Sequence, residues 1–222
     1  MKTKVIVVKS VEDLEKIRKV EEDSRVIIIL MEDIDFVDPI EYFSGNYIES
    51  GKPKFTPISK RGLSVIFYGN GHTISNLNVS TNYSDCAGLF SKVDNLYIRN
   101  TRFYQAKVKG RDSVGVIAGE VNGKANIKNT EIIGGDVEGK LYVGGMVGFA
   151  YSMTVSDSSV TTQLKADDLY GAVVGTAMDS FSSKNVDATA WESSEGIGPV
   201  IEHNNLCGLT RSDKNMKKVR KQ

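Results

Sequence analysis

Val143-Gly144-Gly145-Met146-Val147-Gly148 is one copy of a short glycine-rich phrase that recurs along this chain. Related copies occupy residues 86–90, 114–119 and 170–175, and a degraded copy occupies 197–201. The aligned glycines, Gly88, Gly115, Gly144, Gly171 and Gly198, are separated by 27, 29, 27 and 27 residues. A period of this size is typical of stacked supersecondary units, each too small to bury its own apolar face.

A second set of residues keeps nearly the same period. In each unit an asparagine or aspartate follows an alternating apolar strand, as in Ala125-x-Ile127-x-Asn129. The members of this set, Asn100, Asn129, Asp157 and Asn185, lie 29, 28 and 28 residues apart. Short polar side chains at a bend can bond to the backbone and tolerate left-handed φ. We therefore expect a column of bends in which stacked side-chain amides pair.

The period favours a parallel β-helix. Three strands of about five residues and three bends account for the 27–29 residues of a coil. Equivalent strands of successive coils then stack about 4.8 Å apart around an apolar interior. A leucine-rich repeat would need its own leucine consensus and a helical half in each unit, and a propeller blade takes about 40 residues. The predicted fold is all-β, a right-handed parallel β-helix, the hand following the general preference for right-handed crossovers.

The chain reads as one β-helix domain over residues 1–210. Val11, Leu14, Ile17 and Val20 recur at helical spacing, so an amphipathic helix is predicted over 10–23. We expect this helix to cap the first coil, because a repeat array must cover its terminal apolar layer. Residues 42–62 are rich in glycine and proline and predict a long surface loop. Residues 211–222 predict a basic, disordered tail.

Composition excludes several classes of protein. The chain holds 28 basic and 28 acidic residues, so its overall charge predicts no polyanionic partner, and only the tail offers a weak nucleic-acid contact. Neither a signal-peptide core nor a run long enough to span a bilayer is present. This predicts a cytoplasmic protein, or a secreted one if a leader has been removed. Two distant cysteines, Cys86 and Cys207, predict no zinc site.

The sequence offers no convincing catalytic constellation. Polysaccharide lyases and hydrolases on this fold need carboxylates aligned on successive coils. The acidic residues here occupy different positions in their repeats, apart from Asp157, whose role we expect to be structural. His72 follows a Gly-Asn-Gly turn and His203 lies near the end of the chain. We therefore predict a protein that is not an enzyme and has no metal or cofactor.

Aromatic residues supply the candidate binding site. Tyr97 alternates with the inward Leu96 and Ile98, so its side chain should point outward. Phe103 and Tyr104, together with the loop residues Tyr42 and Tyr47, are the other candidates for exposed rings. Exposed aromatic rings suit either a sugar or a protein interface. The predicted binding residues are thus Tyr42, Tyr47, Tyr97, Phe103 and Tyr104, and the glycine and asparagine columns are predicted to be structural.

Several stretches carry a resemblance to a known family. Phe-Thr-Pro-Ile at 55–58, the segment 67–77, Gly88-Leu89-Phe90 and especially residues 143–150 resemble the GLUG-motif repeat proteins. The likeness covers roughly residues 26–200. It implies a right-handed β-helix of the pectate-lyase type, found within large secreted bacterial surface proteins, adhesins or protease accessory regions.

Three functional hypotheses follow. The first is a non-catalytic protein that binds a protein partner through a rigid β-helix surface, including the case of an inhibitor or decoy inside a cell. The second is a cell-surface adhesin or carbohydrate-binding fragment. The third is a polysaccharide lyase or hydrolase.

Overall fold

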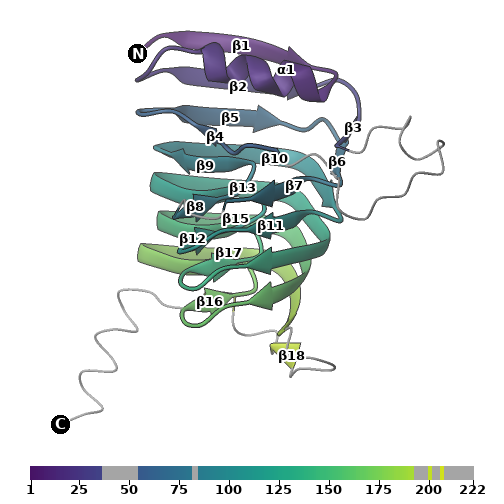
Figure 1. Ribbon diagram of the computed structural model, residues 1–222, viewed down its shortest axis with the longest axis vertical. Coiled ribbons are helices and arrows are strands. Elements are labelled where there is room, and N and C mark those ends of the chain that lie inside the picture. The colour runs from purple at the N-terminus through teal and green to yellow at the C-terminus, as the bar shows by residue number, and fades with distance from the viewer. Residues whose placement is uncertain (37–54, 82–84, 193–199, 202–205, 208–222) are drawn as a thin grey trace.

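The structure is a computed structural model that describes residues 1–36, 55–81, 85–192, 200–201 and 206–207. The chain winds into a parallel β-solenoid of about five turns, stacked along one axis (Figure 1). The predicted all-β fold class is therefore confirmed. The basic tail, His203 and most of the expected long loop, including Tyr42 and Tyr47, lie outside the described residues.

The largest sheet runs the length of the stack, and each coil contributes its longest strand to it. The sheet order is β1-β2-β5-β10-β13-β15-β17-β18, parallel throughout except at β18. Its parallel members are β1 (Thr3–Val8), β2 (Arg25–Leu30), β5 (Ser64–Tyr68), β10 (Asn95–Tyr104), β13 (Ala118–Glu138), β15 (Val147–Lys165) and β17 (Val174–Glu192).

Shorter strands complete the coils. A second parallel sheet, of order β16-β14-β12-β8, is made by the glycine-rich phrases. Its strands are β8 (Cys86–Ala87), β12 (Ser113–Val114), β14 (Val143–Gly144) and β16 (Tyr170–Gly171). The remaining short strands, which join the large sheet, are β3 (Ile34–Asp35), β4 (Ile58–Ser59), β6 (Thr73–Ser75), β7 (Asn78–Ser80), β9 (Phe90–Val93), β11 (Lys107–Lys109) and β18 (Val200–Ile201).

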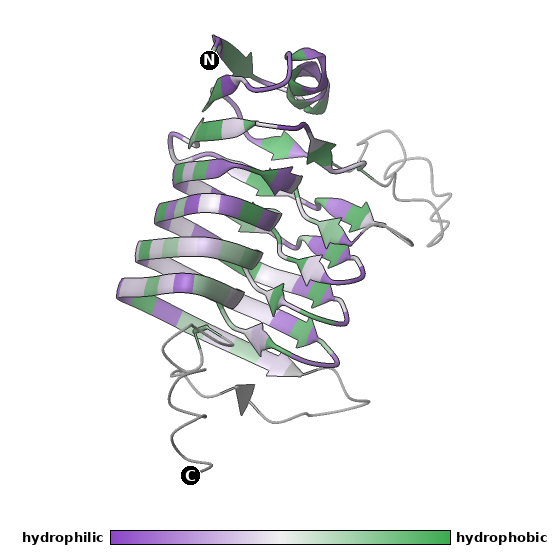
Figure 2. Ribbon diagram, turned by 90° about the vertical axis from the view of Figure 1, so that its left-hand side faces the viewer, coloured by the Kyte–Doolittle hydropathy of each residue, from purple (hydrophilic) through white to green (hydrophobic). Residues whose placement is uncertain are grey.

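The interior is a continuous apolar column. Buried residues alternate with exposed or half-buried ones along most of the strands. The ribbon in Figure 2 shows hydrophobic and hydrophilic residues interspersed along the coils. Phe67, Phe90 and Phe103 are among the largest fully buried side chains. Since burying one large apolar side chain contributes about 1.5–3 kcal/mol, the stacked interior supplies most of the driving force for folding.

The predicted asparagine column is confirmed in geometry. Asn100, Asn129, Asp157 and Asn185 have φ values of 54°, 46°, 51° and 51°. The Asn129 Nδ2 donates to Asn100 Oδ1 at 2.9 Å, and the Asn185 Nδ2 donates to Asp157 Oδ1 at 2.9 Å. The Asn185 amide also lowers the pKa of Asp157. Each residue therefore makes a left-handed bend and bonds along the stack.

The glycine columns are also in register, and they allow close backbone packing. Gly144 pairs with Gly171, and the adjacent strands align β8 with β12 and β12 with β14. A Cβ on Gly88 would lie 2.6 Å from the Gly115 carbonyl oxygen, and one on Gly115 would lie 2.7 Å from that of Met146. No real Cβ approaches a backbone oxygen so closely, so these positions require glycine.

The N-terminal helix is shorter than predicted. It consists of α1 (Val11–Glu15) and a 3-10 turn, η1 (Lys16–Lys19), instead of one helix over 10–23. Val20 is already extended, with ψ of 145°, and Asp23 has a φ of 52°, so the chain turns back toward β2. Leu14 and Ile17 are nonetheless fully buried. Figures 1 and 2 show the helix beside β1 and β2 at the N-terminal end of the stack.

Two other expectations were wrong in detail. Residues 55–62 were assigned to a surface loop, yet Phe55 and Ile58 are buried and β4 pairs with β9. Residues 197–201 were expected to repeat the glycine-rich phrase. Residues 197–199 are not described, and β18 pairs antiparallel with β17 through Trp191 and Ala190 instead of extending the second sheet.

Candidate functional site

The outer surface of the large sheet carries an apolar patch at its N-terminal end. Val5 and Val7 of β1 are 56% and 48% exposed. Ile27 and Ile29 of β2, Ile66 and Tyr68 of β5 and Tyr97 of β10 are half-buried on the same side. We name these seven residues the apolar face: Val5, Val7, Ile27, Ile29, Ile66, Tyr68 and Tyr97.

Strand register arranges the apolar face in two columns. One column runs from Val5 through Ile27 and Ile66 to Tyr97, and the other runs from Val7 through Ile29 to Tyr68. Register alone fixes these neighbours, because successive residues of a strand point to opposite faces of the sheet. The patch is therefore continuous across four adjacent strands.

The same two columns become polar in the later coils. Beyond Tyr97 the first column continues as Asn126, Thr154 and Ser182. Beyond Tyr68 the second continues as Arg99, Lys128, Ser156 and Lys184. The fold is therefore compatible with polar side chains at these outer positions of the sheet. The isoleucines and tyrosines of the apolar face are consequently not required by the solenoid.

The polar border of the apolar face is well defined. The Arg99 guanidinium lies 4.4 Å from the centre of the Tyr68 ring and 6.0 Å from that of Tyr97, in cation–π geometry. An open groove of about 700 Å³ runs beside Tyr97. Its lining includes Asp23, Arg25, Ser64, Asp94, Asn95 and Asn126. Apolar side chains with a polar rim form the usual anatomy of a protein interface.

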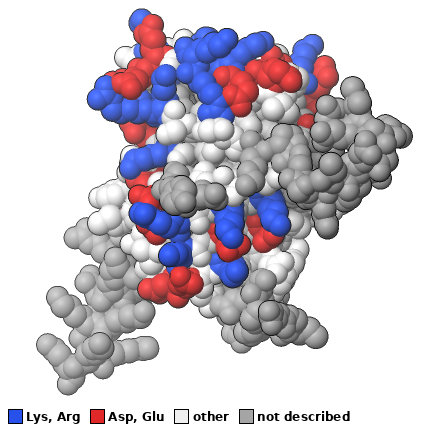
Figure 3. All heavy atoms as spheres, viewed as in Figure 1, with Lys and Arg blue, Asp and Glu red and all other residues white. Residues whose placement is uncertain are grey.

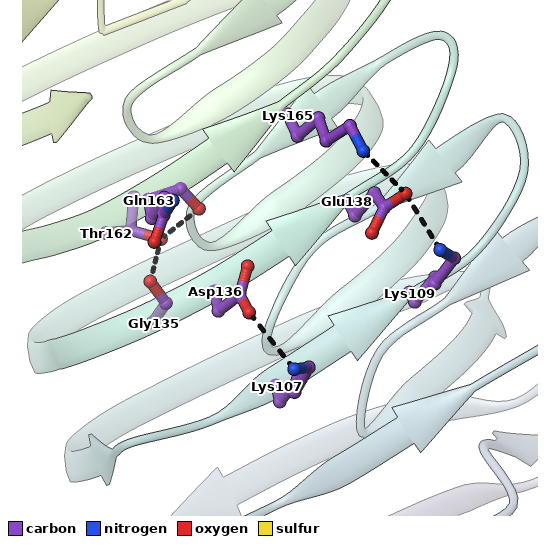
Figure 4. A network of polar contacts seen from close by, with 8 residues as sticks. All are labelled: Lys107, Lys109, Gly135, Asp136, Glu138, Thr162, Gln163 and Lys165. Carbon is purple, nitrogen blue, oxygen red and sulfur yellow. Dashed lines mark hydrogen bonds and ion pairs between the residues drawn. The ribbon is translucent and has the colours of Figure 1, made fainter. Parts of the chain in front are cut away.

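A different side of the solenoid is charged, and its charges are paired between coils. Figure 3 shows acidic and basic side chains interleaved around β11 and its neighbours. In the network of Figure 4, Lys107 pairs with Asp136 at 3.6 Å, and Glu138 pairs with Lys109 at 2.8 Å and Lys165 at 3.4 Å. Lys109, and to a lesser extent Lys165, lowers the pKa of Glu138. The acidic and basic side chains of this network are therefore paired with one another.

Cys86 lies in a small polar cluster next to the second sheet. Its Sγ lies 3.3 Å from Glu120 Oε2, and Glu120 Oε1 lies 2.6 Å from Lys92 Nζ. Burial and then the hydrogen bond to Glu120 raise the pKa of Cys86 to about 12. The sulfur is therefore a thiol at neutral pH, whereas nucleophilic attack needs the thiolate.

His72 pairs with an aspartate of the preceding coil. The His72 Nδ1 lies 3.0 Å from Asp33 Oδ1, which also accepts a hydrogen bond from the Thr73 backbone N–H at 2.9 Å. The Thr73 bond and, less strongly, His72 lower the pKa of Asp33. Asp33 thus ties the turn of one coil to the next, which is a structural arrangement.

The structure separates the aromatic residues singled out from the sequence. Tyr97 points outward as expected and lies in the apolar face. Tyr104 is 42% exposed, on a separate segment past the Asn100 bend. Phe103 is fully buried, so the expectation that its ring is exposed was wrong. It packs inside the solenoid in register with Ile74 and Ile132.

Two further observations concern sites and membranes. Within the described ranges no group of three or more histidine, cysteine, aspartate or glutamate side chains is placed to hold a metal ion. None of the helices in the described part of the chain is long and apolar enough to cross a bilayer.

Fold and surface together define a parallel β-solenoid with an apolar face on the outer surface of its N-terminal strands. No family model matches the chain, so the GLUG likeness stands as a resemblance. Halomucin from Haloquadratum walsbyi is 37% identical over 100 residues, which are 44% of this chain. The match spans about 1% of the length of Halomucin. A crystal structure of a protein provisionally assigned as an immunoglobulin A1 protease, from Bacteroides ovatus, aligns over 96% of this chain and 86% of that one, with a TM-score of 0.46 and 14% identity.

Proposed function

We propose that this chain is a non-catalytic binding protein that holds a protein partner against the apolar face. The observation that carries the proposal is the change of the two outer columns from apolar to polar, which follows Tyr97 of β10 in the first column and Tyr68 of β5 in the second. Fold stability does not explain that change, because both halves of the sheet use the same backbone geometry. A flat, rigid platform loses little conformational entropy when it binds, which favours affinity.

The composition of the apolar face favours a protein over a sugar as its partner. Five of its seven residues are valine or isoleucine in exposed or half-buried positions: Val5, Val7, Ile27, Ile29 and Ile66. Aliphatic side chains offer a sugar hydroxyl no hydrogen bond, whereas they pack well against apolar side chains of a protein. Tyr68 and Tyr97 are residue types enriched at the centre of protein interfaces.

A triple variant tests the binding role of the apolar face. Ile27→Thr, Ile66→Thr and Tyr97→Asn place on the first column the residue types that Thr154 and Asn126 show it can carry. The solenoid should therefore stay folded, with an unchanged circular dichroism spectrum. Immobilised protein is incubated with lysate of the native host, and captured proteins are quantified by mass spectrometry. At least one partner captured by the wild type should fall tenfold or more, and cross-links should map it to the apolar face.

The matched control is Lys107→Ala with Asp136→Ala, which removes one ion pair from the charged side. The control should retain the partner. The proposal fails if the triple variant captures the same proteins as the wild type, or if the control loses the same partner to the same extent.

A second candidate function has support from the sequence comparison. A stretch of 100 residues recurs at 37% identity within a far longer protein, Halomucin. The second candidate is therefore a segment of a larger protein, for which we propose adhesion or carbohydrate binding. A glycan array separates the candidates, because binding to glycans that is lost in Tyr97→Asn would support this second function over a protein partner.

A further inference from the structure

The first strand of the large sheet has one edge with which no described strand pairs. Within the described ranges β1 pairs with β2 alone, in parallel, and stands at the end of the sheet order (Figure 1). The Arg25 N–H donates to the Lys2 carbonyl, and the Met31 N–H donates to the Val8 carbonyl. In a parallel ladder, alternate residues bond to the same neighbour. The N–H and C=O groups of Thr3, Val5 and Val7 consequently face away from β2, and no strand among the described residues pairs with them.

The side chains along this edge do not cover it. Val5 and Val7 stand on the outer surface as the first members of the apolar columns, and both are largely exposed. Ile6 and Val8, on the inner side, are buried together with Leu14 and Ile17 of the helical segment. The helix thus closes the apolar interior at this end, while the backbone edge of β1 stays open to one additional strand.

A basic groove lies directly beside the edge. It has a volume of about 270 Å³ and is lined by residues of β1, η1 and the connection to β2. Its charged residues are Lys2, Lys4, Lys19 and Glu21. Glu21 pairs with Lys2 at 2.7 Å, and in the described part of the chain neither Lys4 nor Lys19 has an ion-pair partner. The groove therefore has two uncompensated positive charges.

From these observations we infer that the β1 edge and its lysine groove bind an extended, acidic segment of a partner protein as an added strand. The backbone of that segment bonds to Thr3, Val5 and Val7, which is the mode of β-augmentation. Its outward side chains are apolar and lengthen the columns begun by Val5 and Val7. Its inward side chains are carboxylates that reach Lys4 and Lys19. The inference rests on the proposed protein-binding role and names the chemistry of the partner.

Charge decides between this occupant and a second copy of the chain. Pairing of β1 with β1 of another copy would bring a second set of the same lysines to one edge, and like charges on adjacent strands are destabilising. Lysines on edge strands commonly oppose such self-pairing. An acidic segment instead neutralises the groove.

A labelled peptide tests the inference by fluorescence anisotropy with the full chain. The probe alternates valine and glutamate over seven residues, and a valine–lysine peptide of the same length is its control. We expect the valine–glutamate peptide to bind at least tenfold more tightly than the valine–lysine peptide. Two further probes have N-methyl groups on all valines or on all glutamates. Since only one set of backbone groups faces β1, one of these two should lose binding while the other retains it.

Variants locate the binding on the protein. Val5→Pro removes an N–H that faces the open edge and leaves the hydrogen bonds between β1 and β2 intact. Lys4→Glu replaces a positive charge of the groove with a negative one. Each variant should lower the affinity for the valine–glutamate peptide tenfold or more. Lys128→Glu, on the outer surface four strands further along the sheet, and the triple variant of the apolar face should bind it normally. Amide hydrogen exchange should slow at Val5 and Val7 on binding. The triple variant thus tests the proposed function separately from the edge.

Three results would overturn the inference. The first is equal binding of the valine–glutamate and valine–lysine peptides. The second is full binding by both N-methylated probes, which would mean that charge attraction alone, and not an added strand, accounts for the binding. The third is a dimer in sedimentation velocity that Val5→Pro dissociates, which would assign the edge to a second copy.

Discussion

Gly144→Ala is expected to lower the free energy of unfolding by about 3 kcal/mol. A Cβ at Gly144 would overlap the carbonyl oxygen of Val147 and lie 2.6 Å from the Gly175 nitrogen. Both neighbours are backbone atoms, Val147 in the same coil and Gly175 in the next, and side-chain rotation cannot move them aside. The second sheet must therefore separate around this position. Equilibrium urea unfolding, followed by circular dichroism, measures the change.

Gly134→Asn is the matched control in the same part of the chain. Gly134, unlike Gly144, has a left-handed conformation, with φ of 68°, and among the described residues the atom nearest to a Cβ there is Gln105 Cγ at 3.8 Å. Asn76 and Gln105 occupy left-handed positions in the earlier coils, with φ of 57° and 52°. Asparagine should cost less than about 1 kcal/mol here. Equal losses for the two variants would contradict the close stacking of the glycine columns.

Leu14→Ala is expected to destabilise the protein by about 3 kcal/mol. Leu14 is fully buried in the helical segment, within the same apolar cluster as Ile6 and Val8 of β1. No strand of the described residues lies on the outer edge of β1, so this segment is what keeps water from the end of the interior. Besides the loss in urea unfolding, hydrogen exchange should accelerate first in β1 and β2, because terminal coils contact only one neighbour.

The control for the cap is Lys19→Ala, an exposed position on the following turn. It should change stability by no more than about 0.5 kcal/mol. If Leu14→Ala also has so small an effect, or if exchange rises evenly through all coils, the helical segment does not cap the solenoid.

The sequence predicts the repeated coils well because their residues recur at equivalent positions. Asn129 and Gly144 are each required by a local constraint, a left-handed bend or a close backbone contact, and both constraints return in the four later coils, those that contain β10, β13, β15 and β17. The degraded copy at 197–201 shows the limit of this reasoning. Val200 and Ile201 kept the apolar pattern but pair antiparallel with β17.

Side-chain direction is harder to predict across a bend. Ile98 and Phe103 are five residues apart, and in an uninterrupted strand they would face opposite sides. The left-handed residue Asn100 lies between them and changes the alternation, so both side chains point inward. Simple alternation from Ile98 would therefore place the Phe103 side chain outward, whereas it is fully buried.

The apolar face was missed for a related reason. Residues 25–30 contain an unbroken run of apolar residues, which is typical of a strand buried on both sides, so Ile27 and Ile29 gave no sign of facing outward. The spacing of the first coils also departs from the later period, since Ile27 pairs with Ile66 across 39 positions. The patch could have been predicted by aligning the strands that contain Ile27 and Ile66 with the strand that contains Tyr97.

The in-register stacking of coils is tested most directly by cross-linking two engineered cysteines. Asn126→Cys and Thr154→Cys are introduced together in a background with Cys86→Ser and Cys207→Ser. These outward positions are neighbours on adjacent parallel strands, about 4.8 Å apart. Dibromobimane, which becomes fluorescent when it joins two thiols, should link them in the folded protein. Asn126→Cys with Ser182→Cys, two strands apart at about 10 Å, should stay unlinked. Fluorescence from the second pair and none from the first would contradict the solenoid, and with it the continuity of the apolar face.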